Sequence, residues 1–311
     1  MSNIMTLPRH IPVLLDEVLE ALQVHPGGYF VDCTVGPGGH AAAILERVRP
    51  SGKLLGIDLD VEAIRISEEN LRQYGDAVIL VNDNFSNLEA ICHRYHFHPV
   101  DGILFDLGVS SLQLDTARRG FSFQLDAPLD MRFDPRQELT ASHIVNSLSE
   151  EELAQLIAKY GEERRSRDIA RKIVQNRPVT HTVQLARLVE QVLGPKRGKV
   201  HPATRTFMAL RIAVNDELGN LERALEQTVA LLRPKGRLVV ISYHSLEDRI
   251  VKQFMRRSAS SCLCPPQTTV CCCGHVPTLR IISRKVIRPS ALEIKSNPRS
   301  RSAKLRVAER L

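Results

Sequence analysis

Residues 29–40, Tyr-Phe-Val-Asp-Cys-Thr-Val-Gly-Pro-Gly-Gly-His, constrain the fold of this 311-residue chain more than any other stretch. A short apolar run leads into a glycine turn at 36–39, and a helical pattern follows at once, with one apolar face formed by Ala41, Ile44, Leu45 and Val48. Strand, glycine turn and helix in this order open a doubly wound α/β sheet. Because glycine has no side chain, a ligand can approach the backbone N–H groups of such a turn closely.

Polar and aromatic side chains follow the next apolar runs. Asp58 ends the run 53–58, nineteen residues after Gly39, and a carboxylate there suits a ribose diol because it accepts from both hydroxyls. Phe85 follows a third run at 77–81, and Asp106 ends a fourth at 100–106. Ligands of parallel sheets bind beyond the carboxyl ends of the strands, so these residues and Gly38 are expected at one edge. Together they predict a nucleoside cofactor without saying which one.

Simpler interpretations exist for each residue alone. The glycines can serve a tight turn, Asp58 can be a solvated strand end, Phe85 can be core, and Asp106 can cap the next turn. The spacing Gly36-x-Gly38-x-x-Ala41 also fits a dinucleotide fingerprint. A nicotinamide-dependent oxidoreductase therefore stays open as a rival, although no second dinucleotide half is evident.

Bulk composition is that of an ordinary globular protein, 43% hydrophobic and 25% charged, with a net charge of +7 that permits a polyanionic partner. Residues 1–8 lack the basic start and apolar run of a signal peptide, and no stretch approaches the roughly 20 apolar residues of a membrane span. Five of seven cysteines crowd into 262–273, unlike a secreted disulfide framework. These features predict a cytoplasmic protein without a membrane partner.

The alternation of strands and helices breaks in the middle of the chain. Between 113 and 214 no strand is convincing, whereas helical spacing is clear around Leu153 and Leu185, and residues 164–211 hold twelve Lys or Arg against two acids. Sheet-like runs resume at 237–241, 279–287 and 303–308, and we expect the last two to pair in antiparallel fashion. The capping-box spacing of 245–248 predicts the start of a helix. We expect one α/β domain, 1–112 and 215–311, interrupted by a helical substrate-recognition domain, 113–214.

Eight segments in order along the chain resemble the RsmH (formerly MraW) family, namely 10–15, 32–40, 106–113, 119–123, 129–132, 160–164, 201–207 and 245–251. The resemblance implies a class I (Rossmann-like) S-adenosylmethionine-dependent methyltransferase sheet with an inserted all-helical domain. It further implies methylation of N4 of a cytidine in the decoding region of bacterial 16S rRNA, position 1402 in standard rRNA numbering. The partner would then be 16S rRNA or the small ribosomal subunit.

The resemblance also assigns cofactor contacts. By position these are Gly38, Gly39 and His40 in the first turn, Asp58 on the ribose, Phe85 beside the adenine, and Asp106 and Gln113 after the fourth strand. Pro37 departs from the family pattern by stiffening the turn, but it leaves the neighbouring glycines available.

The chemistry asks mainly for positioning, because the sulfonium methyl is already electrophilic and the cytosine amine is a weak nucleophile. Oxygen acceptors on the amine hydrogens would favour the positive charge growing on nitrogen, and our catalytic candidates are Asp106 and Ser110. Attack through a cysteine, as methylation at the ring carbon C5 requires, is disfavoured because no cysteine stands directly after the fourth strand, where the base should arrive.

Four residues of the basic region are predicted to contact RNA: Arg132, Arg205, Arg211 and Asn215. A solvated face is the alternative. Phe121, Phe123, Met131 and Arg132 can stack on or clamp an unstacked base, and packing of the insertion onto the sheet is the alternative for the two phenylalanines. A noncatalytic RNA-binding or assembly factor is the second rival function, and the sequence leaves open whether the chain forms a homodimer and whether naked RNA suffices as substrate.

The cysteine-rich segment has zinc-ligand residue types at an unusual spacing, in Cys262, Cys264, Cys271, Cys272, Cys273 and His275. Reduced thiols on an irregular loop are the alternative. We name no metal ligand from sequence.

Overall fold

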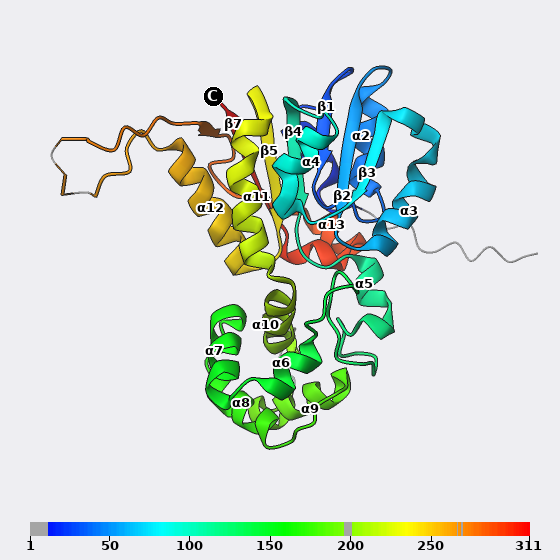
Figure 1. Cartoon of the computed structure of the whole chain (residues 1–311), viewed down its shortest axis with the longest axis vertical. Coiled ribbons are helices and arrows are strands. Elements are labelled where there is room, and N and C mark those ends of the chain that lie inside the picture. Colours follow the sequence, from blue (N-terminus) through cyan, green and yellow to red (C-terminus); the bar gives the residue numbers. More distant parts are fainter. Residues whose placement is uncertain (1–11, 196–200, 266, 269) are drawn as a thin grey trace, which may run out of the picture. The chain divides into compact units, whose positions relative to one another are not determined.

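The computed structural model describes residues 12–195, 201–265, 267–268 and 270–311 (Figure 1). The chain divides into two compact units, unit 1 (Met1–Gly108 and Asn220–Leu311) and unit 2 (Val109–Gly219). The predicted insertion falls inside unit 2, and its assignment to substrate recognition stays a prediction. Part of the first resembling segment, 10–11, and three of the twelve basic residues, Lys196, Arg197 and Lys199, lie outside the described residues.

Unit 1 is built on a seven-stranded sheet in the order β3-β2-β1-β4-β5-β7-β6. Its strands are β1 (Tyr29–Asp32), β2 (Lys53–Asp58), β3 (Val78–Asn82), β4 (Val100–Asp106), β5 (Leu232–Ser242), β6 (Leu279–Ile281) and β7 (Lys304–Arg310). The first five are parallel, and β7 runs antiparallel to both β5 and β6. The predicted class I methyltransferase sheet is confirmed. The strand order reverses between β1 and β4, which is the point where ligands bind in such sheets.

Helices cover both faces of this sheet, as parallel strands require. One face carries α1 (Leu15–Ala21), α2 (Gly39–Val48) and α3 (Val61–Leu71), and the other carries α4 (Leu88–Arg94), α11 (Glu217–Leu231) and α12 (Ser245–Ala259). Successive strand residues alternate between the two cores: in β4, Leu104 packs on the first, whereas Ile103 and Phe105 pack on the second. The remaining elements are η1 (Arg72–Ala77), η2 (Phe85–Asn87), α13 (Ala291–Ser296) and η4 (Pro298–Ser302).

Two local expectations in unit 1 need correction. Helix α12 begins at Ser245, but its N-cap is His244, whose ring accepts from Glu247 N at 3.4 Å while the Glu247 carboxylate accepts from His244 N at 3.2 Å. The predicted capping box was therefore one residue late, because a histidine ring nitrogen can accept like a serine hydroxyl. The strand predicted over 279–287 ends at Ile281, although its antiparallel pairing with β7 is confirmed.

Unit 2 is helical. It contains α5 (Ser111–Asp115), η3 (Ala117–Arg119), α6 (Ala141–Ser147), α7 (Glu150–Gly161), α8 (Ser166–Val174), α9 (Thr182–Leu193) and α10 (Thr204–Asn215) around a core of its own. Both predicted helices, α7 and α9, are present, and among the described residues only an isolated bridge, Pro128 to His181, adds β structure to this unit. Within the described ranges no helix is long and apolar enough to cross a membrane.

Candidate cofactor site

The turn between β1 and α2 is shaped by glycines. Gly36 has φ +53°, and Gly38, the N-cap of α2, has φ +90°. Residues that have a Cβ atom rarely adopt such positive φ angles. A Cβ on Gly39 would lie 2.6 Å from Pro12 Cγ, so this glycine lets the turn pack against the segment before α1. The first N–H groups of α2 have no carbonyl partner in their own helix, which makes the turn suited to a ligand.

Asp58, at the end of β2, ties the turn to the neighbouring strand. Its Oδ2 accepts from Gly36 N and its Oδ1 accepts from Asp60 N, both at 2.9 Å. Asp60 in turn caps α3 by accepting from Glu62 N at 3.1 Å. A carboxylate offers about four acceptor positions, so these contacts are compatible with a ribose contact as well.

Asp106 stands at the end of β4, beside the point where the strand order reverses. Its Oδ1 accepts from the Tyr243 hydroxyl at 2.7 Å, its Oδ2 lies 3.7 Å from His40 Nδ1, and its backbone N donates to Thr34 Oγ1 at 2.7 Å. His40 is buried, and its Nε2 lies 3.0 Å from the carbonyl oxygen of Val13. A carbonyl can only accept, so Nε2 carries the proton and Nδ1 faces Asp106 as an acceptor.

Burial perturbs the titration of this cluster. It raises the pKa of Asp106 to about 7 and, with the nearby charges of Asp106 and Asp58 adding to it, raises the pKa of Asp32 to about 6. Burial lowers the pKa of His40, so the imidazole is neutral at pH 7. The pKa of Tyr243 is well above its usual value, and its hydroxyl remains a donor. The cluster therefore binds a positive group more readily than an anionic one.

This electrostatic property tests which cofactor fits. S-adenosylmethionine has a sulfonium cation, which would favour the ionised forms of Asp32 and Asp106. The pyrophosphate of a dinucleotide is anionic, and three carboxyl groups at the strand ends would repel it. The residues present fit the sulfonium cofactor.

Phe85 begins η2, directly after β3. Its ring meets that of Phe105 edge-on, with centroids 5.6 Å apart and an interplanar angle of 86°, and it is half-buried. The contact anchors Phe85 beside the strand ends, where the resemblance expects an adenine neighbour.

Ser110 and Gln113 belong to unit 2, where they form the capping box of α5. Ser110 Oγ accepts from Gln113 N at 3.2 Å, and Gln113 Oε1 accepts from Ser110 N at 3.0 Å. Their predicted catalytic and cofactor roles are not decided by this pairing and stay predictions.

Of the predicted RNA contacts, three side chains have partners inside unit 2. The Arg132 guanidinium donates to Asp130 at 2.7 and 2.8 Å, and Arg211 donates to both carboxylate oxygens of Glu217 at 2.7 and 2.9 Å. Asn215 is buried, accepts from Phe133 N at 2.7 Å and donates to Met131 O at 2.8 Å. The two Asn215 contacts hold the loop 131–133 against α10.

Arg205 also has partners inside unit 2, but it is far more exposed than the other three. Its guanidinium donates to Glu162 O at 3.3 Å and lies 3.7 Å from the Glu163 carboxylate, and its side chain is 55% exposed. Of the four candidates it is the residue whose guanidinium faces solvent.

The aromatic candidates of unit 2 are largely packed. Phe121 and Met131 are buried in the helical core. Phe123 stacks on His201 with ring centroids 4.3 Å apart. Burial in this core agrees with the packing interpretation of Phe121, whereas Phe123 is half-buried beside a second ring. Met131, a candidate for contact with the base, is buried as well.

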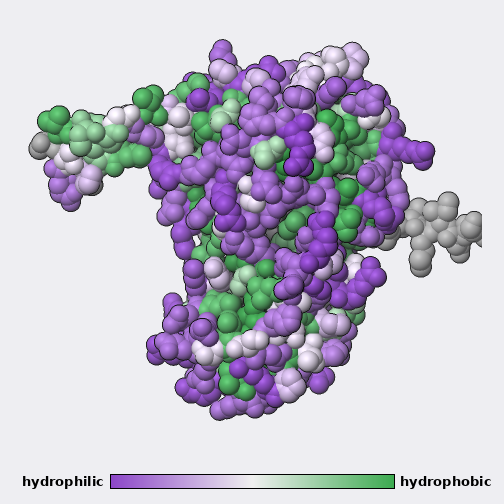
Figure 2. Space-filling model, in the orientation of Figure 1, coloured by the Kyte–Doolittle hydropathy of each residue, from purple (hydrophilic) through white to green (hydrophobic). Residues whose placement is uncertain are grey.

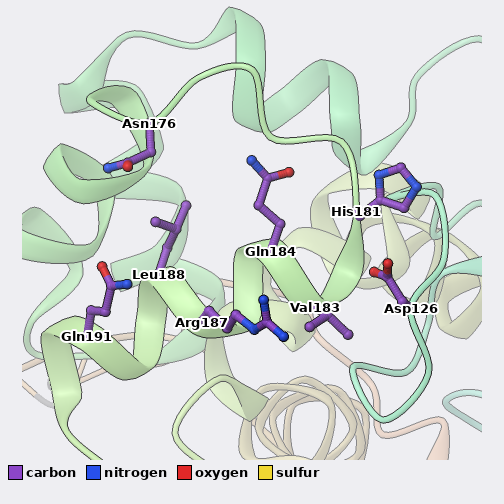
Figure 3. A pocket seen from close by; sticks show the side chains of 8 residues that line it. All are labelled: Asp126, Asn176, His181, Val183, Gln184, Arg187, Leu188 and Gln191. Atoms are coloured by element: carbon purple, nitrogen blue, oxygen red, sulfur yellow. The ribbon is translucent and has the colours of Figure 1, made fainter.

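Unit 2 also has a hollow of about 700 Å³ along α9 (Figure 3). Polar side chains dominate its lining, which consists of Asp126, Asn176, His181, Val183, Gln184, Arg187, Leu188 and Gln191. Five of these project from successive turns of α9, so the hollow lies along one face of this helix, and Asp126, Asn176 and His181 add to it from other segments.

Three residues around Asp106 were not singled out from the sequence. Asp32 and Thr34 lie within the glycine motif, and Tyr243 directly follows β5. The rule that ligands lie beyond strand ends applies to β5 as well as to β1–β4, and it points to Tyr243.

Comparisons with known proteins agree with this geometry. The profile described as the MraW methylase family matches residues 8–311. "Ribosomal RNA small subunit methyltransferase H" of Dehalococcoides mccartyi (strain BAV1) is 59% identical over 302 residues, covering 97% of this chain and 86% of the relative. The protein of that name in Thermomicrobium roseum is 54% identical and covers 97% of this chain and 94% of the relative. Its counterpart in Geobacter sulfurreducens is 51% identical and covers 97% of this chain and 99% of the relative. The chain therefore belongs to the MraW methylase family and is an S-adenosylmethionine-dependent methyltransferase.

Proposed function

We propose that this enzyme methylates N4 of a cytidine in the decoding region of 16S rRNA. The names of its relatives support small-subunit rRNA as the substrate. The observation that carries the reaction is the oriented Asp106 carboxyl group at the end of β4, held by Tyr243 and flanked by His40. The names of the relatives, which are methyltransferases, disfavour the noncatalytic rival.

The geometry of unit 1 supports the proposed cofactor contacts. The backbone of Gly38 and Gly39 at the start of α2, the Asp58 carboxylate and the Phe85 ring would bind the nucleoside and amino acid parts of S-adenosylmethionine. His40 would hold Asp106 in place next to the cofactor. The resemblance to the family adds Gln113 to the proposed cofactor contacts. The cofactor supplies a methyl group on a positive sulfur, which needs no further activation.

The task of the protein is then to orient the amine. Asp106 would accept a hydrogen bond from the cytosine amino group and stabilise the positive charge that develops on nitrogen. The Tyr243 hydroxyl occupies one oxygen of Asp106 and thereby directs the carboxyl group. With a pKa near 7, Asp106 also matches the pH at which a proton must leave the product amine. Ser110 is proposed as a second oxygen acceptor.

The RNA contacts are proposed for unit 2. Arg205 would contact phosphate directly, because its guanidinium is exposed. Arg132 and Asn215 would act on RNA through the shape of the loop 131–133. Arg211 would act through its pairing with Glu217 beyond the end of α10. A base must be unstacked to enter a catalytic pocket, and looped RNA makes this easier. Such a substrate places the enzyme in the cytoplasm.

Mass spectrometry of small-subunit RNA tests the proposal. RNA from cells lacking this protein should miss one methyl group on a decoding-region cytidine, and the wild-type chain, but not an Asp106→Ala variant, should restore it. Full methylation without the protein would refute the assignment. Methyl transfer in vitro to naked 16S rRNA and to assembled subunits then identifies the substrate form.

A further inference from the structure

The loop 260–278 connects α12 and β6, and its described residues, all but 266 and 269, extend from unit 1 without a core of their own (Figure 1). Its ends are held to α12, where Thr278 N donates to Ser258 O at 2.8 Å and His275 Nε2 lies 3.1 Å from Arg257 O. Its apolar side chains face solvent, with Val270 77% and Val276 71% exposed, and the loop is largely hydrophobic in Figure 2. Apolar burial therefore does not explain how this loop is ordered.

Four cysteine sulfurs converge inside the loop. The Sγ atoms of Cys262, Cys264, Cys271 and Cys273 all lie within 4.8 Å of one another. Cys262 and Cys271 are 3.3 Å apart, Cys271 and Cys273 are 3.5 Å apart, Cys262 and Cys273 are 3.8 Å apart, and Cys264 and Cys271 are 4.0 Å apart. Four sulfurs bound tetrahedrally at about 2.3 Å from one zinc ion would be about 3.8 Å apart, so these spacings match a zinc tetrahedron.

Backbone N–H groups point at two of these sulfurs. Cys264 N donates to Cys262 Sγ at 3.3 Å, and Leu263 N donates to Cys273 Sγ at 3.4 Å. Hydrogen bonds of this kind orient metal ligands and stabilise thiolates. Each of the seven cysteines, all within the described ranges, is free of disulfide bonding.

The spacing explains which cysteines converge. The ligand pairs are Cys262-x-Cys264 and Cys271-x-Cys273, and in extended backbone alternate side chains point to the same side. Cys272 is consequently outside the four-sulfur group, and His275 is bound to the end of α12 instead. The geometry selects four of the six ligand candidates in this segment.

We propose that Cys262, Cys264, Cys271 and Cys273 bind one zinc ion in a closed structural site that orders the loop 260–278. Each thiol gives its proton to solvent as its sulfur binds the metal. Four thiolates leave no position for water or substrate, so the site would serve folding rather than catalysis. Zinc and iron both accept four thiolates, and the test must distinguish them.

Metal analysis of the full chain, purified reduced and without chelator, is the first test. We expect about one zinc and no iron per chain, and a Cys271→Ser variant should lose most of it. Cys272→Ser is the matched control from the same loop, and it should retain the metal. A metal-free wild-type protein, stoichiometric iron, or equal loss in Cys272→Ser would overturn the proposal.

Limited proteolysis separates a structural site from an adventitious one. Removing zinc with a chelator should expose 260–278 to cleavage at least tenfold faster, while the affinity for S-adenosylmethionine changes less than about twofold. Re-addition of zinc should restore protection in the wild type and in Cys272→Ser, but not in Cys271→Ser. An unchanged cleavage rate on chelation would show that the metal does not order the loop.

Discussion

The carboxyl cluster of unit 1 and the arginines of unit 2 use charge in opposite ways. In this cluster, which is formed by Asp32, Asp58 and Asp106, burial raises the pKa of Asp32 and of Asp106, and the charges of Asp106 and Asp58 add to the rise at Asp32. In unit 2, Arg132 and Arg211 are neutralised by carboxylates of the same unit. Uncompensated charge indicates a site for a ligand of opposite sign, whereas compensated charge indicates architecture. Local charge counts alone do not distinguish the two.

The largest expected effect concerns Asp106. Replacing it by alanine should slow single-turnover methyl transfer about 10²–10³-fold at saturating cofactor, because a preorganised acceptor is lost from the growing charge. Asp106→Asn, which keeps the shape and an oxygen acceptor, should be less impaired. Rapid-quench measurement with assembled small subunits gives the rate, and thermal unfolding checks the fold. Normal transfer by Asp106→Ala would remove this residue from the mechanism.

Arg211 tests the other side of the comparison. Arg211 makes a bidentate contact with Glu217, and the two side chains are only 14% and 9% exposed, respectively. Arg211→Ala should therefore cost about 3 kcal/mol of folding free energy, because it leaves a poorly solvated carboxylate without its guanidinium. Urea denaturation measures this loss. Unchanged stability together with weakened RNA binding would instead return Arg211 to the role predicted from sequence.

These two residues show what sequence reasoning could and could not reach. Asp106 was identified because the apolar run before it fixes where β4 ends, and the ends of parallel strands meet at one edge. Arg211 was chosen from a local excess of basic residues. Its partner Glu217 lies six positions further on, beyond the end of α10, and the turn that brings them together depends on Asp216 at φ +46°. Composition does not encode that turn.

The cysteine segment falls between these cases. Ligand types and alternation were visible in the sequence, but zinc was not assigned because the spacing is not that of known fingers. Whether Cys262–Cys264 and Cys271–Cys273 meet depends on the path of the intervening loop, which no hydrophobic periodicity specifies. The positions of the helices and parallel strands, in contrast, could be predicted from the pattern of apolar residues. Burial on one face of a helix, or on both faces of a strand, determines that pattern.

Asp58 should affect binding rather than chemistry. Asp58→Ala should weaken S-adenosylmethionine binding about 10–100-fold by removing the proposed ribose acceptor and loosening Gly36, whose N–H group donates to Asp58 at 2.9 Å. Calorimetric titration measures the change. Asp60→Ala is the control, because it removes the cap of α3 without touching ribose and should leave the affinity within about threefold. Equal losses in both variants would mean that the helix start, not the ribose contact, is responsible.

The pH dependence of binding gives a smaller effect of predictable sign. The pKa of Asp106 is raised to about 7, so the cationic cofactor should bind about tenfold more weakly at pH 6 than at pH 8, where the carboxylate is ionised. The raised pKa values also mean that the free protein loses stability as pH rises through 6 to 7, since its folded state holds protons that the unfolded chain has released. Asp106→Asn should flatten both profiles. Cofactor affinity that falls with rising pH would contradict the electrostatic account.

Arg205 should show the smallest effect and the sharpest contrast with Arg211. Arg205→Ala should leave stability within about 0.5 kcal/mol, because its ion pair with Glu163 is long and the guanidinium is exposed. RNA affinity should fall a few-fold, and the slope of log affinity against log salt should decrease by about 0.7, the value for one phosphate contact on a single strand. Arg65 on α3 is a matched control, since it is also 55% exposed and paired with acids, in Glu62 and Glu69. If Arg65→Ala lowers the slope equally, the effect is one of net charge, and the phosphate contact assigned to unit 2 is wrong. If only Arg205→Ala does so, exposure within unit 2, rather than the count of basic residues, identifies the RNA-binding arginines.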